Sequence, residues 1–411
     1  MAEPLRILLL CSKFPYPPKD GGTMAMMSMI RGFADAGHHV TVLTMNTPKH
    51  YVQLGSLPSA LREVATFIAV DVDTSVNFVD ALANLLFSKE SYHIQRFTSQ
   101  AFFREIQDLL DRQTFDVIQL ETLFMVPYLD MIRKLAPNAL VTYRAHNVEH
   151  EIWARRAANE LNPIKKAVLE TTALRIEAYE QATISSNPFD VVVPITGKDA
   201  ATLKKMGNKS PEYVCPAAMR FEEAEQWKGQ VEWPSLFYLG ALDWEPNKEG
   251  LRWFLKLVWP KMRKKYPALT FYIAGRNMPA EFSSHRDQNI QVLGEVESAS
   301  DFIRPRGVMI VPILSGSGMR VKLLEGMAHR KAIVATTIAA EGMGVKSGEH
   351  LYLADEPQAF ADAISTLIDN RALCELIADQ GYHFVKSRFS NDKIVGGLLD
   401  FYRGKLSTKS K

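Results

Sequence analysis

The chain has 411 residues, 47% of them hydrophobic and 23% charged, which excludes a disordered protein and exceeds one ordinary domain. A formal net charge of +2 argues against broad nucleic-acid binding, so a basic site must be a local cluster. The three cysteines, Cys11, Cys215 and Cys374, are scattered without a Cys-x-x-Cys pair, which argues against a structural zinc site or a disulfide framework.

The N-terminal apolar run, in "LRILLLC" (5–11), is only about six residues long and is followed at once by a proline-rich stretch. A secretory signal needs about 7–15 apolar residues, and a membrane span needs about 18. We therefore expect a buried first strand and a cytoplasmic protein. The mixed basic and apolar stretch 155–180 is compatible either with a peripheral contact on the inner face of the membrane or with a helix packed on the first sheet.

Short apolar runs typical of buried strands alternate with helix-like segments along the chain. These runs are 6–11, 39–45, 67–72, 115–120, 140–145 and 190–195 in the first half, and 236–241, 269–275, 290–294, 308–313, 332–336 and 350–354 in the second. Continuous apolar strands separated by helices predict parallel sheets covered on both faces. We predict two doubly wound, Rossmann-like α/β domains facing a central cleft, over 1–220 and 221–390. A C-terminal helix over 391–411 could cross back to the first domain.

Two features of the first half lie where predicted strands end, the edge at which open α/β sheets bind ligands. Gly21 and Gly22 follow the first run and precede a helix whose N-cap we expect to be Thr23. Paired glycines there admit a ligand close to the backbone, and a simple flexible turn is the alternative. His146 follows the fifth run, with Asn147 as the expected cap of the next helix. An ordinary hydrogen-bonded histidine is the alternative to a functional one.

A rival motif ends the third run, where Asp71 and Asp73 form an Asp-x-Asp triplet. Paired aspartates can hold Mg²⁺ or Mn²⁺. Such triplets are common, however, and a metal site here would leave the second α/β half unexplained. We therefore expect no metal site.

In the second half, a loop containing Gly316 and Gly318 leads from the run 308–313 to Arg320 and Lys322. Cations in the first turn of a helix oppose its dipole. A strand, a glycine-rich loop and a helix also present backbone N–H groups to an anion, and a bound diphosphate would offset the repulsion. We expect an anion site here, and a surface helix with a Lys322–Glu325 pair is the alternative.

Two further strand ends in this half carry polar residues. Asn247 follows Pro246 and is the expected cap of a helix, and Arg276 follows the run 269–275. Neither the Gly-Lys-Ser/Thr of a P-loop nor a Gly-x-Gly-x-x-Gly dinucleotide fingerprint occurs at the Arg320 loop. The predicted site therefore differs from both of these phosphate-binding loops.

Taken together, these stretches resemble the family-4 retaining glycosyltransferases of the GT-B fold, in the branch that reads G-x-G-x-R-x-K-x-L-E. That pattern is in "VPILSGSGMRVKLLEGM" (311–327), and "FPYPPKDGG" (14–22), "HNVEHEIWARR" (146–156) and "YLGALDWEPNKEGLRWF" (238–254) are similar to the same branch. The resemblance covers nearly the whole chain. It implies an acceptor-side first domain and a second domain that binds a nucleotide-diphosphate sugar.

The resemblance also implies residue roles. Arg320 and Lys322 would bind the donor diphosphate, and Glu325 would hold the nucleotide ribose. Gly316, Gly318 and Arg276 are further candidates for donor binding, because they follow predicted strands. Gly21 and Gly22 would border the phosphates and the acceptor, and His146 would lie near the donor sugar, which makes His146, Arg320 and Lys322 the candidate catalytic residues.

The sequence departs from the family pattern at three positions. Ser317 replaces a glutamate that usually contacts the sugar, and Ala241 and Pro246 replace basic residues of the phosphate site. Arg320 and Lys322 would compensate for these missing cations.

The expected activity is retaining, metal-independent hexosyl transfer from a nucleotide-diphosphate sugar to a hydroxyl acceptor, without a further cofactor. The acceptor would be a glycan, a polysaccharide precursor or a lipid-linked sugar of the cell envelope. Two alternatives stay open: a nucleotide-sugar 2-epimerase-like enzyme and a non-catalytic nucleotide-sugar-binding partner.

Overall fold

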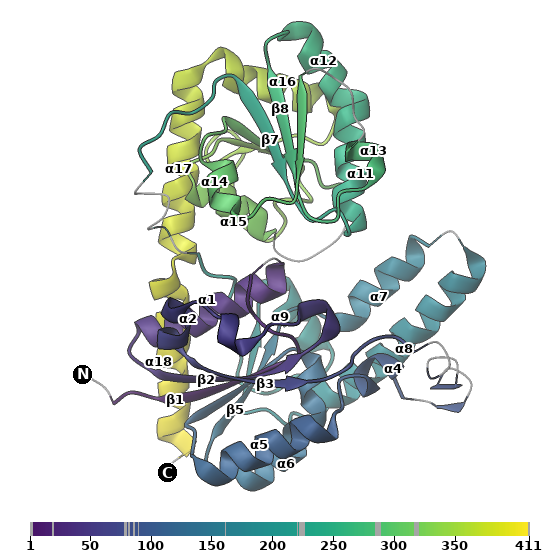
Figure 1. Cartoon of the computed structure of the whole chain (residues 1–411), viewed down its shortest axis with the longest axis vertical. Coiled ribbons are helices and arrows are strands. Elements are labelled where there is room, and N and C mark those ends of the chain that lie inside the picture. The colour runs from purple at the N-terminus through teal and green to yellow at the C-terminus, as the bar shows by residue number, and fades with distance from the viewer. Residues whose placement is uncertain are drawn as a thin grey trace. The chain divides into compact units, whose positions relative to one another are not determined.

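The computed structural model describes residues 3–18, 20–77, 80, 83–84, 87–88, 90–160, 162–219, 221, 227–283, 289–315 and 320–409. The chain divides into two compact units (Figure 1). Unit 1 comprises Met1–Ala218 and Ile394–Lys411, and unit 2 comprises Met219–Lys393. The chain thus changes unit near the predicted divisions at 220/221 and 390/391.

Unit 1 is built on a six-stranded parallel sheet in the order β3-β2-β1-β4-β5-β6. Its strands are β1 (Arg6–Cys11), β2 (His39–Asn46), β3 (Thr66–Asp71), β4 (Val117–Glu121), β5 (Leu140–Ala145) and β6 (Val191–Pro194). The order reverses between β1 and β4. Such a switch point opens a crevice at the carboxyl ends of the strands, where open α/β sheets bind ligands.

Helices cover both faces of this sheet (Figure 1). They are α1 (Gly21–Asp35), α2 (Ser59–Val64), α4 (Tyr92–Gln95), α5 (Gln100–Arg112), α6 (Leu129–Leu135), α7 (Glu149–Ala158), α8 (Pro163–Ser185), α9 (Gly197–Lys205) and α18 (Asn391–Lys409), with short 3₁₀ turns at Pro48–His50, Leu54–Ser56 and Leu123–Tyr128. Residues of α1, α2 and α18 pack on one face, and residues of α5, α6, α8 and α9 pack on the other. Apolar strands are required because neither face meets water.

Unit 2 has a second six-stranded parallel sheet, in the order β12-β11-β10-β7-β8-β9. Its strands are β7 (Ser235–Leu239), β8 (Thr270–Ala274), β9 (Ile290–Gly294), β10 (Val308–Val311), β11 (Ile333–Ala335) and β12 (Tyr352–Leu353). Its helices are α11 (Glu245–Trp253), a π segment (Phe254–Val258), α12 (Trp259–Lys265), α13 (Ala280–Ser283), α14 (Ala299–Ile303), α15 (Val321–Ala328), α16 (Pro357–Asp369) and α17 (Arg371–Phe389). The switch point of this sheet lies between β10 and β7.

Each apolar run predicted from the sequence overlaps a strand, and each sheet is parallel with helices on both faces. The prediction of two doubly wound α/β domains is confirmed. Only Ser390 separates α17 of unit 2 from α18, whose buried residues Leu398 and Tyr402 belong to the core of unit 1.

The helix α11 packs closely against the backbone of Pro312 at Gly250, which gives a testable prediction. A Cβ added there would lie 1.6 Å from the carbonyl oxygen of Pro312, whereas nothing lies within 4 Å of a Cβ at Gly396 of α18. Gly250→Ala is expected to destabilise the protein by about 3 kcal/mol, because backbone would have to move. Gly396→Ala, the matched helical control, is expected to stabilise by about 0.5–1 kcal/mol. Thermal unfolding of both variants checks this, and equal melting temperatures would contradict it.

Candidate active site

The carboxyl edge of the unit 2 sheet at its switch point is where β7 and β10 pair. The segment after β7 leads into α11, and Arg320 is the N-cap residue of α15, the helix that follows β10. Arg320 is buried, with 6% of its surface exposed, and its guanidinium carbon lies 4.9 Å from the centre of the Trp244 ring. A cation on an indole face at this edge of the sheet is placed to meet an anion.

Lys322 of α15 contacts residues of β7, of the segment after it and of α11. Its ammonium donates a hydrogen bond to the Asn247 Oδ1, 2.8 Å away, and lies 4.9 Å from the centre of the Tyr238 ring. A Cβ at Gly240 would lie 2.6 Å from the same ammonium, so the glycine leaves room for it. The helix α15 and the segment after β7 therefore hold Lys322 between them.

Burial, together with the nearby charge of Arg320, lowers the pKa of Lys322 to about 7. Glu325 acts in the opposite direction, since it follows Lys322 by three residues on the same helix. An anion bound here would raise this pKa, because it stabilises the protonated form. This edge of the sheet thus has two neighbouring basic side chains whose repulsion an anionic ligand would relieve.

The prediction that Asn247 caps a helix is wrong. The N-cap residue of α11 is Trp244, and Asn247 lies inside the helix with 3% of its surface exposed. Its amide nitrogen donates to the Ala241 carbonyl, 2.7 Å away, so both ends of the side chain are used. The helix starts earlier because Glu245 and Pro246 suit the first turn.

The other predicted residues of unit 2 lie as follows. Arg276 follows β8, the neighbour of β7, and its guanidinium Nη2 lies 3.5 Å from the Asp243 carboxylate. Glu325 lies in α15 on the same helix as Lys322. Gly316, Gly318 and Ser317 lie outside the described residues.

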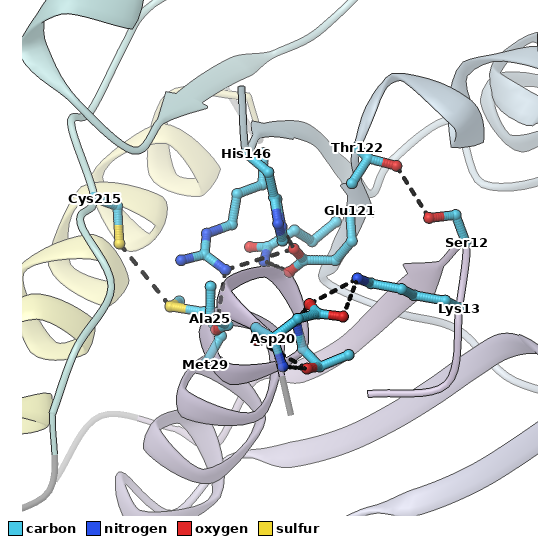
Figure 2. Close-up of polar contacts among 12 residues, drawn as sticks. Ser12, Lys13, Asp20, Ala25, Met29, Glu121, Thr122, His146 and Cys215 are labelled. Carbon is cyan, nitrogen blue, oxygen red and sulfur yellow. Dashed lines mark hydrogen bonds and ion pairs between the residues drawn. The ribbon is translucent and has the colours of Figure 1, made fainter. Parts of the chain in front are cut away.

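In unit 1, His146 lies directly after β5 and contacts Glu121, the last residue of the adjacent strand β4 (Figure 2). Glu121 and Arg144 are register partners in β4 and β5, and both are fully buried. The Arg144 Nη1 lies 3.5 Å from the Glu121 Oε2 and donates to the Ala25 carbonyl, 3.2 Å away. The structure therefore places the predicted histidine in a buried ionic cluster at the carboxyl edge.

The charged groups of this cluster shift one another's pKa values. Burial would raise the pKa of Glu121, but Arg144 and the bond with His146 outweigh it and hold that pKa below its usual value. For His146, burial lowers the pKa more than Glu121 raises it, while Arg144 and Lys13 lower it further. His146 is thus a neutral imidazole beside an ionised carboxylate at neutral pH.

Gly21 and Gly22 are the first residues of α1 rather than a loop before it. The expectation that Thr23 is the N-cap is wrong, because Asp20 is the N-cap residue. The Asp20 carboxylate accepts a hydrogen bond from the Thr23 N–H, and the Thr23 hydroxyl oxygen accepts one from the Asp20 N–H. Lys13, in the loop after β1, forms an ion pair with Asp20 at 2.8 Å (Figure 2). A Cβ at Gly22 would lie 3.2 Å from the Lys13 ammonium. Gly22 thus leaves space above the helix start for this ammonium.

The helix after His146 also begins differently from the prediction. Val148, not Asn147, is its N-cap residue, and no side chain caps it. The Glu180 carboxylate of α8 accepts bonds from the backbone N–H groups of Glu149 and His150, at 3.0 and 3.2 Å. Glu180 therefore accepts the hydrogen bonds that an N-cap side chain would otherwise accept at the start of α7.

Three side chains at these edges were not predicted to be functional: Lys13, Glu121 and Trp244. Each lies at, or shortly after, the end of a strand. A charged or aromatic residue directly after a continuous apolar strand is the signal that points to Lys13 and Glu121. Nothing in the local sequence separates them from other strand-end residues, since their importance comes from neighbours distant in the chain.

The Asp-x-Asp triplet has ordinary structural contacts. Asp71 accepts a bond from the Asn46 amide at 2.9 Å, and Asp73 accepts one from the Ser75 N–H at 2.8 Å. Within the described ranges, no group of three or more His, Cys, Asp and Glu side chains is placed to hold a metal ion. Likewise, none of the helices in the described part of the chain has both the length and the hydrophobicity to cross a membrane.

Part of unit 2 matches a known protein family in sequence. Residues 233–370 match the family of glycosyl transferases group 1, a range that contains Trp244, Asn247, Arg320 and Lys322. An uncharacterized 44.6 kDa protein in the cps region of Klebsiella pneumoniae is 23% identical over 96% of this chain and 99% of its own length. The phosphatidyl-myo-inositol mannosyltransferase of Mycobacterium leprae is 26% identical over 43% of this chain and 48% of its own length.

Solved structures match nearly the whole chain. Sucrose-phosphate synthase from Thermosynechococcus elongatus has a TM-score of 0.71 at 14% identity, over 98% of this chain and 100% of its own. The Anabaena protein HepE, in complex with UDP-glucose, has a TM-score of 0.63 at 12% identity, over 97% and 100%. The two α/β units thus have the GT-B fold, and the match of residues 233–370 supports a glycosyltransferase of the group 1 family.

Proposed function

We propose that this protein transfers a sugar from a nucleotide-diphosphate sugar to a hydroxyl acceptor. Unit 2 binds the donor and unit 1 serves the acceptor side through His146 and the start of α1. The observation that carries the proposal is the Lys322–Asn247 bond at the switch point of the unit 2 sheet, beside Arg320. This is the edge at which open α/β sheets bind nucleotides, and it lies within the range matched by the glycosyl transferase family.

The hard step of glycosyl transfer is the departure of the nucleoside diphosphate while positive charge grows on the anomeric carbon. Arg320 and Lys322 stabilise the charge on the leaving group, and Glu325 holds the ribose. Preorganised cations at a leaving group stabilise the additional negative charge that develops on it as it departs, and one such group is worth about 10²–10³ in rate. Gly316, Gly318 and Arg276 complete the proposed phosphate site.

The proposal includes retention of the anomeric configuration and independence of metal ions. The departing phosphate accepts the proton of the acceptor hydroxyl on the same face of the sugar, so no catalytic carboxylate pair is required. Proton NMR of the first product tests retention, and transfer in the presence of EDTA tests metal independence. A product of opposite configuration would overturn the first, and loss of transfer restored by Mg²⁺ would overturn the second.

The donor is a UDP-sugar or another nucleotide-diphosphate sugar, and the acceptor a glycan, a polysaccharide precursor or a lipid-linked sugar. HepE was solved with UDP-glucose, the Mycobacterium relative is named for a lipid acceptor, and the Klebsiella relative is named for a cps region. A lipid-linked acceptor would bring the protein to the inner face of the membrane as a peripheral protein.

Ligand-dependent thermal unfolding tests the donor site. In a panel of nucleoside diphosphates and nucleotide sugars, we expect the ligands that carry one particular base to raise the melting temperature by several degrees. A ligand at 100 times its Kd adds about 2.7 kcal/mol to the free energy of unfolding. The shift should vanish in Arg320→Ala. It should persist in Arg252→Ala, which removes an exposed arginine of α11 that pairs with Glu245 and Glu281.

The outcomes separate the candidate functions. No shift with any ligand on folded protein, or an equal shift in both variants, would contradict the proposed phosphate site. Conversion of a nucleotide sugar without acceptor would indicate an epimerase, and binding without transfer or slow donor hydrolysis would indicate a non-catalytic partner.

A further inference from the structure

A chain of hydrogen bonds leads from the C-terminal helix to His146 through the core of unit 1. The hydroxyl of Tyr402 in α18 donates to the Gln119 Oε1 at 2.7 Å, and the Gln119 amide donates to the Glu121 Oε1 at 2.5 Å. The other carboxylate oxygen of Glu121 bonds to the His146 Nε2 (Figure 2). Tyr402, Gln119 and Glu121 are fully buried, whereas His146 retains 9% of its surface. The chain therefore runs from the core to the carboxyl edge of the sheet.

The direction of each bond follows from the groups that face Glu121. Arg144 in β5 keeps Glu121 ionised, and an ionised carboxylate only accepts hydrogen bonds. The Gln119 amide already donates to one oxygen because Tyr402 occupies the Gln119 carbonyl. His146 must then donate from its Nε2–H.

The protonation state of the second imidazole nitrogen, Nδ1, follows from this. A neutral imidazole with its proton on Nε2 has a lone pair on Nδ1. The charged and titratable groups around His146 are Glu121 of β4, Arg144 of β5 and Lys13 of the loop after β1, and burial with the two cations keeps the ring neutral. Among the described residues, none forms a hydrogen bond with Nδ1. The acceptor nitrogen is available to a ligand.

We propose that Glu121 is a positioning residue that fixes His146 in the Nε2–H tautomer, with Nδ1 presented as a hydrogen-bond acceptor to a hydroxyl group of the bound sugar or acceptor. Gln119 and Tyr402 orient Glu121. This inference rests on the proposed function for the identity of the hydroxyl ligand. The tautomer itself does not depend on the proposed function.

The first test is the imidazole ¹⁵N spectrum of ¹⁵N-histidine-labelled protein without ligand, with the His146 signals identified by their loss in His146→Gln. At pH 7.5 we expect a proton on Nε2 and none on Nδ1. In Glu121→Gln, the side-chain amide can donate as well as accept, so a population protonated on Nδ1 should appear. A proton on Nδ1 in the wild type, or a charged imidazolium at pH 7.5, would overturn the inference.

The second test is kinetic, with the donor found in the ligand panel. Loss of an outer orienting group commonly costs about 10–100-fold, and we expect kcat of Glu121→Gln to fall by about this factor with KM changed far less. Unchanged tautomer and unchanged kcat in this variant would overturn the positioning role.

Tyr402→Phe provides a milder variant in case Glu121→Gln does not fold. It removes one hydroxyl that is three hydrogen bonds away from His146, and we expect kcat to fall by about 2–10-fold. Tyr143→Phe is the matched control, because the Tyr143 hydroxyl is buried in the same unit and has no hydrogen-bond partner among the described residues. Equal kcat in both variants would contradict a role for Tyr402.

Failure of the two proposals can be told apart. If no nucleotide sugar is bound or turned over but the ¹⁵N spectra are as expected, the proposed function fails and the fixed tautomer stands. If transfer occurs but the wild-type spectrum shows Nδ1–H, the proposed function stands and the role of Glu121 is overturned.

Discussion

Lys322→Met is expected to reduce kcat/KM for sugar transfer by about 10²–10³ and, at the same time, to raise the stability of the unliganded protein by about 1–3 kcal/mol. The rate falls because the donor diphosphate loses one of its two neighbouring cations. The stability rises because the native state confines an ammonium between Tyr238, Gly240 and Asn247, close to the charge of Arg320. A methionine fills similar space without a charge.

The pH dependence of this stability has a definite sign. The pKa of Lys322 is about 7 in the folded protein and 10.5 in the unfolded chain, so the unfolded chain binds more protons between these values. Stability from this group therefore rises with pH from 7 to 10.5, and its penalty is complete below pH 7. The advantage of Lys322→Met over the wild type should be largest at pH 6–7 and shrink towards pH 10.

Thermal unfolding across this pH range measures the effect, and Lys261→Met is the control. Lys261 is an exposed lysine of α12 whose ammonium bonds to Gln358, and its loss should change stability by less than about 0.5 kcal/mol at every pH. A Lys322→Met protein with normal turnover would contradict the donor site. A Lys322→Met protein that is less stable at pH 6 would contradict the cost of burying this ammonium.

The strands were predictable because their pattern is local. A run such as Ile7–Cys11 or Val308–Val311 is apolar at every position, since helices cover both faces of its sheet. The helix starts were predicted less well. Thr23 and Asn247 are suitable capping residues, but Asp20 and Trp244 occupy those positions, because the first turn can begin a few residues earlier without changing the apolar face.

The site was predictable only as a set of separate loops. Lys322 meets Asn247 because β10 pairs with β7, and His146 meets Glu121 because β5 pairs with β4. Strand order depends on tertiary packing between segments far apart in the chain, and the periodicity of one segment carries no record of it. This is why Arg320 and Lys322 were recognised as a cationic pair while the partner of Lys322 was taken for a cap.

Glu149→Gln is expected to stabilise the protein at alkaline pH. Burial, together with the charge of the neighbouring Glu180, raises the pKa of Glu149 to about 8. Glu180 is fully buried and accepts bonds from the N–H groups of Glu149 and His150 and from the His150 ring. Because Glu180 serves these donors, an ionised Glu149 beside it would place two negative charges in one buried site.

The folded protein therefore holds a proton on Glu149 that the unfolded chain, with a pKa of 4.5, has released. Stability from this group falls as pH rises from 4.5 to 8, by on the order of 2–5 kcal/mol over the whole window. Glu149→Gln carries no proton to lose, so its stability should exceed that of the wild type by most of this amount at pH 8.5 and by little at pH 4.5.

Glu170→Gln, which changes an exposed carboxylate of α8, is the control and should follow the wild-type curve within about 0.5 kcal/mol. Equal stability of Glu149→Gln and wild type at pH 8.5 would contradict the buried pair.

Turnover of the stabilised variant tests whether sugar transfer requires a neutral side chain at this position. Glu149 lies three residues after His146 and its pKa responds to Lys13, so a neutral carboxyl there keeps an additional negative charge away from a site proposed to handle phosphates. On that account the glutamine, which is also neutral, should preserve sugar transfer at neutral pH and extend it above pH 8, where the wild type ionises.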